Sequence, residues 1–362
     1  MEDYRFRVNL GGMIEILSDH LYSSPDVYIR ELLQNGVDAI TGRKNLQVGA
    51  GWQEGAAREA SQDQEAAFAP GITLEIEEGR GLTFTDNGQG LTEEEIHQFL
   101  AIIGESSKKN PEDGRIRTDY IGRFGIGLLS CFMVSDEIRV ITRSCRSEDA
   151  PLMEWRGKPD GTYTISGYDG AQAGEQERKQ VGEQVQKPAM EGFVGTKVIL
   201  SAKPGKEDYF TGQVIEKLIT YYGMLLPFPI VIRRNGEEKQ INPSYLPWEG
   251  RDTNKQELML FGQMMFEEQF FDCVPFSSQK GNVSGVAYIL KYPVLPSARS
   301  SHRIYLKNML LTEKGDNLIP DWAVFTKCIV NATDLRPTAS REGFYVDEML
   351  NAAREAIEDS LI

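Results

Sequence analysis

Hydrophobic residues recur at helical spacing through residues 10–22, which predicts an amphipathic helix. Ser24-Pro25-Asp26 then carries the start signals of a second helix: a capping serine, a proline at the first position and an acid near the positive helix end. We predict that this second helix runs to about Thr41. Residues 49–70 are rich in Ala, Gly, Gln and Glu without a clear period, which indicates an insertion.

Alternating apolar and polar positions predict strands farther along the chain. Residues 72–76 and 82–84 alternate on either side of two glycines and predict a hairpin. Thr92-Glu93-Glu94-Glu95 is a capping-box pattern that opens a third helix. The other predictions are a polar loop at 104–121, an exposed polar segment at 171–187, a helical segment at 207–226, and strands at 137–142, 162–166, 196–201, 228–233, 283–291 and 302–307.

A chain of 362 residues is too long for one ordinary core, so we expect two domains. The pattern breaks at Ser201-Ala202-Lys203-Pro204-Gly205, and we therefore assign the domains to residues 1–203 and 204–362. The net charge of -15 argues against a protein that binds nucleic acid through its phosphates.

Location and redox state follow from what the sequence lacks. Met1-Glu2-Asp3-Tyr4 has no basic start or apolar run, so it does not resemble a signal peptide. The most apolar stretch, residues 221–232, is too short to span a bilayer and contains two prolines. We expect a cytoplasmic protein without a membrane partner and with reduced, dispersed cysteines: Cys131, Cys145, Cys273 and Cys328.

The second predicted helix carries the first group of candidate functional residues. Glu31, Asn35 and Asp38 follow helical spacing and share one face, while Leu33, Val37 and Ile40 form an apolar face that suits a core. A carboxylate can polarise an attacking water, and an amide oxygen can complete the shell of Mg²⁺. A solvated polar face is the equally acceptable structural alternative.

A second and a third group contain glycines. Asp86-x-Gly88-x-Gly90 allows a tight turn and close backbone approach, and the carboxylate can accept a hydrogen bond from an exocyclic amine; a plain turn is the alternative. Gly122-Arg123-Phe124-Gly125-Ile126-Gly127 resembles a loop that offers backbone N–H groups to phosphates. A hinge is one alternative. A dinucleotide fold is less favoured because Ser130 stands where its third small residue belongs, and no P-loop pattern is present.

The order ExxxNxxDA, DxGxG, GxxGxG and finally Gly195-Thr196 resembles the GHKL superfamily, which includes gyrase, heat-shock chaperones, histidine kinases and MutL. The flanks resemble the ninety-kilodalton heat-shock chaperones. The segment from Tyr28 to Leu33, the segment Ile121 to Val134, and Asp334-Leu335-Arg336-Pro337-Thr338-Ala339-Ser340-Arg341-Glu342 carry that likeness. It covers nearly the whole chain apart from 49–70 and 168–192.

The resemblance implies an α+β fold: a two-layer α/β sandwich of the GHKL (Bergerat) type, followed by the first part of an α/β middle domain like ribosomal S5 domain 2. It implies that Glu31 activates water, that Asn35 holds Mg²⁺ and phosphate, and that Asp38 lines the site. Adenine would lie at Asp86 with Gly90, Leu91 and Thr196. The phosphates would lie at Gly122, Phe124, Gly125 and Gly127, and Arg341 would reach the terminal phosphate.

The implied function is an ATP-dependent chaperone that binds ATP or ADP with Mg²⁺, unfolded or partly folded client proteins, and co-chaperones. The family continues to a C-terminal dimerisation domain, so we expect a fragment or truncated relative and a dimer only where that domain is present. Three features depart from the family. Glycine stands at position 104, where the family usually has a lysine, and threonine stands at position 338, where an asparagine is usual. The loop 109–120 is shorter than the lid of the family.

Two alternatives stay open. A DNA-linked ATPase of the MutL kind should use a lysine from the second domain and show a basic face, against which the net charge of -15 speaks. A nucleotide-binding module without turnover is the other, and Glu31 speaks against it. A histidine kinase is disfavoured because no helix with a phosphoacceptor-like histidine precedes the site.

Overall fold

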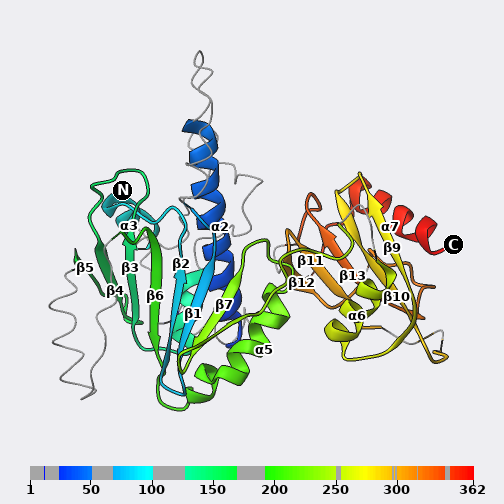
Figure 1. The fold of residues 1–362 in the computed structure, drawn as a ribbon, viewed down its shortest axis with the longest axis horizontal. Coiled ribbons are helices and arrows are strands. Elements are labelled where there is room, and N and C mark those ends of the chain that lie inside the picture. Colours follow the sequence, from blue (N-terminus) through cyan, green and yellow to red (C-terminus); the bar gives the residue numbers. More distant parts are fainter. Residues whose placement is uncertain are drawn as a thin grey trace, which may run out of the picture. The chain divides into compact units, whose positions relative to one another are not determined.

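The chain folds into two compact units in the computed structural model (Figure 1). The first consists of Met1–Thr220 and Phe228–Ile241, and the second of Tyr221–Pro227 and Asn242–Ile362. The structure describes residues 12, 24–50, 68–100, 127–168, 192–249, 254–295, 297, 300–315, 317–338 and 343–362.

In the described part of the first unit, eight strands form one mixed sheet. All neighbouring strands are antiparallel except β1 and β7, which run parallel. The strands, in the spatial order β5-β4-β3-β6-β2-β1-β7-β8, are Tyr163–Gly167, Met153–Gly157, Ile138–Arg143, Gly195–Ser201, Gly81–Asp86, Ile72–Glu77, Ile230–Arg234 and Glu237–Gln240.

Helix α2 (Val27–Ala50) covers one face of this sheet, as Figure 1 shows. The predicted core face of the helix is confirmed, because Leu33, Val37 and Ile40 are all buried. The ring of Phe84 in β2 lies against Gly36, so even-numbered residues of β2 face the helix. The other helical segments are α3 (Glu93–Phe99), η3 (Gly127–Met133), η4 (Glu207–Phe210) and α5 (Gly212–Gly223).

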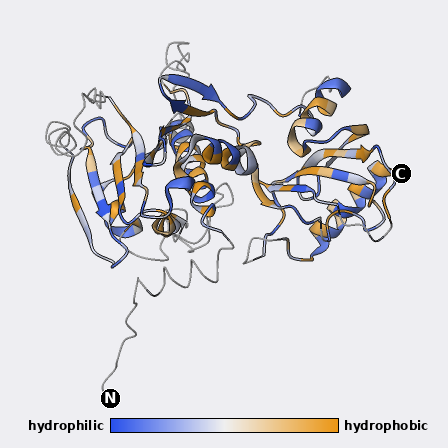
Figure 2. Ribbon diagram, turned by 90° about the horizontal axis from the view of Figure 1, so that it is seen from below, coloured by the Kyte–Doolittle hydropathy of each residue, from blue (hydrophilic) through white to orange (hydrophobic). Residues whose placement is uncertain are grey.

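The second unit is a five-stranded sheet between helices, among the residues described. Its strands, in the order β12-β11-β13-β10-β9, are Met309–Thr312, Arg303–Leu306, Thr326–Ala332, Val283–Leu290 and Phe270–Ser278. Val286 and Tyr288 of β10 pack in one core with α6 (Lys255–Phe266), whereas Val283 and Ala287 pack in another with α7 (Glu348–Leu361). Because strand residues alternate between the two cores, the helices cover opposite faces. Figure 2 colours the ribbon by hydropathy and shows both hydrophobic and hydrophilic residues along the strands.

These two α/β units confirm the predicted α+β class and the sandwich of the first unit. The hairpin, now β1 and β2, is confirmed, as is the capping box at Thr92, where both reciprocal hydrogen bonds form. The predicted end of the second helix near Thr41 is wrong, since α2 continues to Ala50. Gly42 packs against Gln89, and Arg43 donates to the Asn87 carbonyl at 2.8 Å. These contacts with the loop after Asp86 stabilise the helix beyond Thr41.

Other predictions differ from the structure or lie outside the described residues. The expected boundary between residues 203 and 204 lies inside the first unit, because β7 pairs with β1. The helical segment expected at 207–226 is divided at Thr211 into η4 and α5. The helix expected at 10–22, apart from Gly12, the loop expected at 104–121 and the segment at 171–187 lie outside the described residues, as does most of 49–70. Among the helices described, none is long and apolar enough to cross a membrane.

Candidate nucleotide-binding site

Asp86 ends strand β2 with a carboxylate that is almost fully removed from solvent. Its residue exposure is 4%. The N–H of Gly88 donates to Oδ1 at 2.9 Å, and the N–H of Thr196 also donates to the carboxylate. Burial raises the pKa of Asp86 to about 7, although both N–H groups favour the charged form and oppose that rise. A further N–H donor would therefore stabilise the charged form of this carboxylate.

Asp86 stands in a row with two threonine side chains on the neighbouring strands. Asp86 of β2 pairs with Thr196 of β6, and Thr196 pairs with Thr142 of β3. Residues directly opposite in a ladder share a face of the sheet. Because Phe84, two residues before Asp86, faces α2, the whole row faces α2 as well. Sequence reasoning missed Thr142, since only the register of the strands places it next to Thr196.

Gly90 turns the chain from β2 toward α3. Its φ of +63° lies in the left-handed region, and an added Cβ would overlap the carbonyl oxygen of Arg143. The next residue, Leu91, donates its N–H to the hydroxyl of Thr142 at 2.9 Å. This hydrogen bond holds the backbone after Asp86 against the end of β3.

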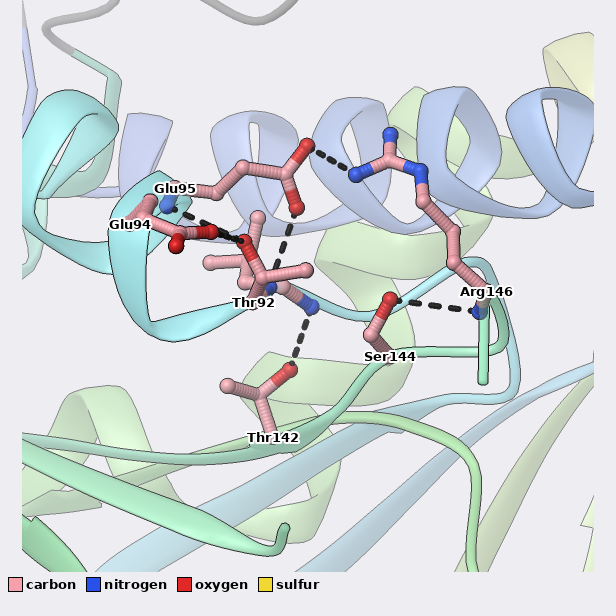
Figure 3. A network of polar contacts seen from close by, with 7 residues as sticks. Thr92, Glu94, Glu95, Thr142, Ser144 and Arg146 are labelled. Carbon is pink, nitrogen blue, oxygen red and sulfur yellow. Dashed lines mark hydrogen bonds and ion pairs between the residues drawn. The ribbon is translucent and has the colours of Figure 1, made fainter. Parts of the chain in front are cut away.

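Helix α3 secures the far side of this turn (Figure 3). Thr92 accepts from the N–H of Glu95, and the Glu95 carboxylate accepts from the N–H of Thr92 at 3.0 Å. The same carboxylate pairs with Arg146, which follows β3. The entrance to α3 and the end of β3 are therefore joined by a cap and an ion pair.

The three predicted residues of α2 lie in different environments. Glu31 and Asp38 are buried, at 5% and 2% exposure, whereas Asn35 is exposed. Two turns of α2 thus present an accessible amide between two desolvated carboxylates. Just past Asp38, the carbonyl of Ala39 accepts the N–H of Gln89 at 2.9 Å, which brings α2 to the loop that follows Asp86.

The other end of this face of α2 meets Gly127, the first residue of η3. The Glu31 carboxylate lies so close to Gly127 that an added Cβ would overlap it. Arg30 forms an ion pair with Glu31 at 3.1 Å. Burial raises the pKa of the nearby Cys131 thiol well above its usual range, and the Glu31 charge adds to the rise. That thiol is therefore neutral, and Glu31 stands in a largely desolvated place beside the η3 backbone.

The structure brings together most of the residues expected at the site that it describes. Asp86, Gly90, Leu91 and Thr196 gather around Thr142, while α2 carries Glu31, Asn35 and Asp38 from Gly127 toward the Asp86 loop. Gly122, Phe124, Gly125 and Arg341 lie outside the described residues, as does Gly104. Thr338, just before Arg341, donates its N–H to the Gly343 carbonyl at 2.9 Å.

Comparison with known proteins finds similarity in the segment that carries this site. Residues 22–172 match the family of histidine kinase-, DNA gyrase B- and HSP90-like ATPases. This match lies within the first unit. The matched segment contains Glu31, Asp86, Gly90 and Gly127.

Curated relatives extend the likeness beyond the first unit. The chaperone protein HtpG of Chlorobium chlorochromatii is 24% identical over 383 residues, which cover 100% of this chain and 55% of the relative. HtpG of Geobacter metallireducens is 23% identical, covering 99% and 56%, and HtpG of Orientia tsutsugamushi is 24% identical, covering 100% and 55%. The chain spans about half the length of these relatives, and the resemblance to the heat-shock chaperone branch is confirmed across both units.

Proposed function

We propose that the first unit binds Mg-ATP and Mg-ADP with the adenine on Asp86. The buried carboxylate carries this proposal: Asp86 is 4% exposed, and burial raises its pKa to about 7, so a further hydrogen-bond donor would stabilise its charged form. An exocyclic amine can supply that donor. Gly90 and Leu91 on one side and Thr196 on the other bound the place where the base would lie.

The phosphates extend along α2 toward Gly127 in this proposal. Asn35 offers an exposed amide oxygen one turn after Glu31, which suits Mg²⁺ because that ion takes oxygen ligands and keeps several waters. The ion would neutralise charge that develops on the transferred phosphoryl group. Glu31, desolvated against Gly127, orients and deprotonates the attacking water as the general base.

The protein that contains this chain acts, we infer, as an ATP-dependent chaperone of client proteins. The likeness to HtpG over both units supports this role more than a DNA-linked one, as does the net charge of -15. Lid closure, co-chaperones, dimerisation, the cytoplasmic location and the role of Arg341 stay predictions from the sequence.

Calorimetric titration of Mg-ATP and Mg-ADP into the chain tests nucleotide binding. We expect the native chain to bind both and Asp86→Asn to bind neither, because the introduced amide presents N–H donors to the amine of the base. Asp136→Asn is the matched control, since it removes an exposed carboxylate from the same unit. Equal binding by the native chain and Asp86→Asn would remove Asp86 from the proposed site.

A turnover assay in the longer protein tests the second half of the proposal. Glu31→Gln should retain nucleotide binding and lose hydrolysis, and it should also lose the refolding of a denatured client. Hydrolysis at the native rate in this variant would leave the chain as a nucleotide-binding domain whose base lies elsewhere.

A further inference from the structure

The hydroxyl of Thr142 stands at the centre of the adenine side of the site, although the proposed chemistry gives it no role. Thr142 is fully buried, with no exposed surface. Its oxygen lies 2.9 Å from the Leu91 nitrogen, 3.0 Å from the Gly195 carbonyl oxygen and 3.2 Å from the Thr196 hydroxyl oxygen. One side chain thus joins the turn after Asp86, the start of β6 and a residue expected to contact the base.

The direction of each hydrogen bond follows from counting protons. A hydroxyl has one proton and two lone pairs. The Gly195 carbonyl can only accept, so Thr142 gives its proton there, and the Leu91 N–H can only donate, so it takes a lone pair of Thr142. The second lone pair is left for Thr196, whose hydroxyl must then be the donor in that pair.

We propose that Thr142 is a positioning residue that fixes the Thr196 hydroxyl as an acceptor toward the bound base. With its proton held by Thr142, Thr196 offers only lone pairs to a ligand. Asp86, its neighbour in the same cross-strand row, offers a carboxylate. The inference rests on the proposed nucleotide site. It adds that the orientation of the Thr196 hydroxyl sets the preference of this site for one base over another.

Two adjacent acceptors favour a purine that carries an amino group at its C6 edge. The amine can donate to Asp86 and, directly or through one water, to Thr196. A 6-keto purine such as hypoxanthine places a carbonyl oxygen against the same two acceptors, which leaves buried lone pairs facing one another. If Thr196 were free to rotate, it could donate to that carbonyl, and the preference for the amine would shrink.

The test compares Mg-ADP with Mg-IDP, whose bases differ at C6, by calorimetric titration into the full chain. Thr142→Val removes the hydroxyl at nearly constant volume and should lower the preference for ADP over IDP about tenfold. Thr142→Ser keeps the hydroxyl and should restore the native preference. Thr85→Val is the matched control, because Thr85 precedes Asp86 in β2 and points to the other face of the sheet, so it should leave the preference unchanged.

The other outcomes would contradict either the role of Thr142 or the proposed function on which it rests. If Thr142→Val weakens ADP and IDP by the same factor, or Thr142→Ser fails to restore the preference, Thr142 supports only the fold. If the native chain binds neither nucleotide, the proposed function itself fails.

A variant at the neighbouring position covers the case in which Thr142→Val does not fold. Thr196→Val removes the oriented hydroxyl itself at a half-buried position and should lose the same preference. An unchanged preference in that variant overturns the proposal, because Thr142 would then have nothing to orient.

Discussion

Replacing Asp86 by asparagine should remove most of the loss of first-unit stability between pH 5 and pH 8 while it abolishes nucleotide binding. The pKa of this carboxyl rises from 3.8 to about 7 on folding, chiefly because the group is buried. An acid whose folded pKa is raised binds more protons in the folded state. Its favourable contribution is therefore complete below pH 3.8 and is lost as the pH rises through 7. Asparagine does not titrate and escapes that loss.

The size of the effect follows from the width of this window. Between pH 5 and pH 8 the folded carboxyl loses its proton near pH 7, while the unfolded one is already ionised. From pH 5 to about pH 7, an interval of about two pH units, only the unfolded carboxyl is ionised. Each unit lowers the stability by about 1.4 kcal/mol, so Asp86 costs the first unit roughly 2–3 kcal/mol between pH 5 and pH 8. The native chain should show this loss, and Asp86→Asn should not.

The measurement must report the first unit alone, because a chain with two units need not unfold in one step. The urea dependence of amide exchange in peptides from β2 and β6 meets that need. The quantity of interest is the difference between pH 5 and pH 8 in the native chain minus the same difference in Asp86→Asn. Asp136→Asn should behave like the native chain. A double difference near zero would show that Asp86 is already ionised at pH 5 and would refute the desolvation argument.

Four further outcomes follow from the same geometry. Adenosine, which has no titrating phosphate, should bind about tenfold more tightly at pH 8 than at pH 6, because binding favours the ionised form of Asp86; calorimetry measures this. Glu31→Gln should lower the steady-state rate of ATP hydrolysis about 10²- to 10⁴-fold with little change in ADP affinity. Gly127→Ala should also slow hydrolysis, because its methyl group displaces the Glu31 carboxylate, and Glu31→Gln should add little to that loss. Gly90→Ala should lower the unfolding free energy of the first unit by at least about 2 kcal/mol in urea, since it combines a left-handed φ with overlap of a carbonyl.

Local signals in the sequence predicted the elements that local chemistry controls. The β1–β2 hairpin and the capping box at Thr92 formed as expected, and α2 begins at Val27, directly after Ser24-Pro25-Asp26 rather than at Pro25. Each depends on residues within a few positions of one another. The acceptor at Asp86 was found in the same way, because its glycines follow it directly.

Elements that depend on distant partners were missed. Strand β4 carries two charged residues, Glu154 and Arg156, and the buried Glu154 is tolerated because Arg139 and Arg156 pair with it at 2.9 and 3.1 Å. Strands β9, β12 and β13 and helix α6 were not predicted either. The central strand β13 shows little alternation because both its faces are buried, which removes the signal used for other strands. Thr142 became visible only when the register placed it between Leu91 and Thr196.

The pairing of β7 with β1 has a consequence for how the protein is made. The chain leaves the first unit at Thr220, contributes seven residues, Tyr221–Pro227, to the second, and returns with Phe228–Ile241 to complete the first sheet. Until β7 has been synthesised, β1 is an open edge with exposed backbone donors and acceptors beside buried Ile72 and Leu74. A nascent chain that already holds Glu31, Asp86 and Thr196 would therefore have every described residue of the site and an unfinished sheet beneath it. Folding of the first unit during translation should wait for residues 228–241 to leave the ribosome, so the nucleotide cannot stabilise the domain before part of its neighbour has been made.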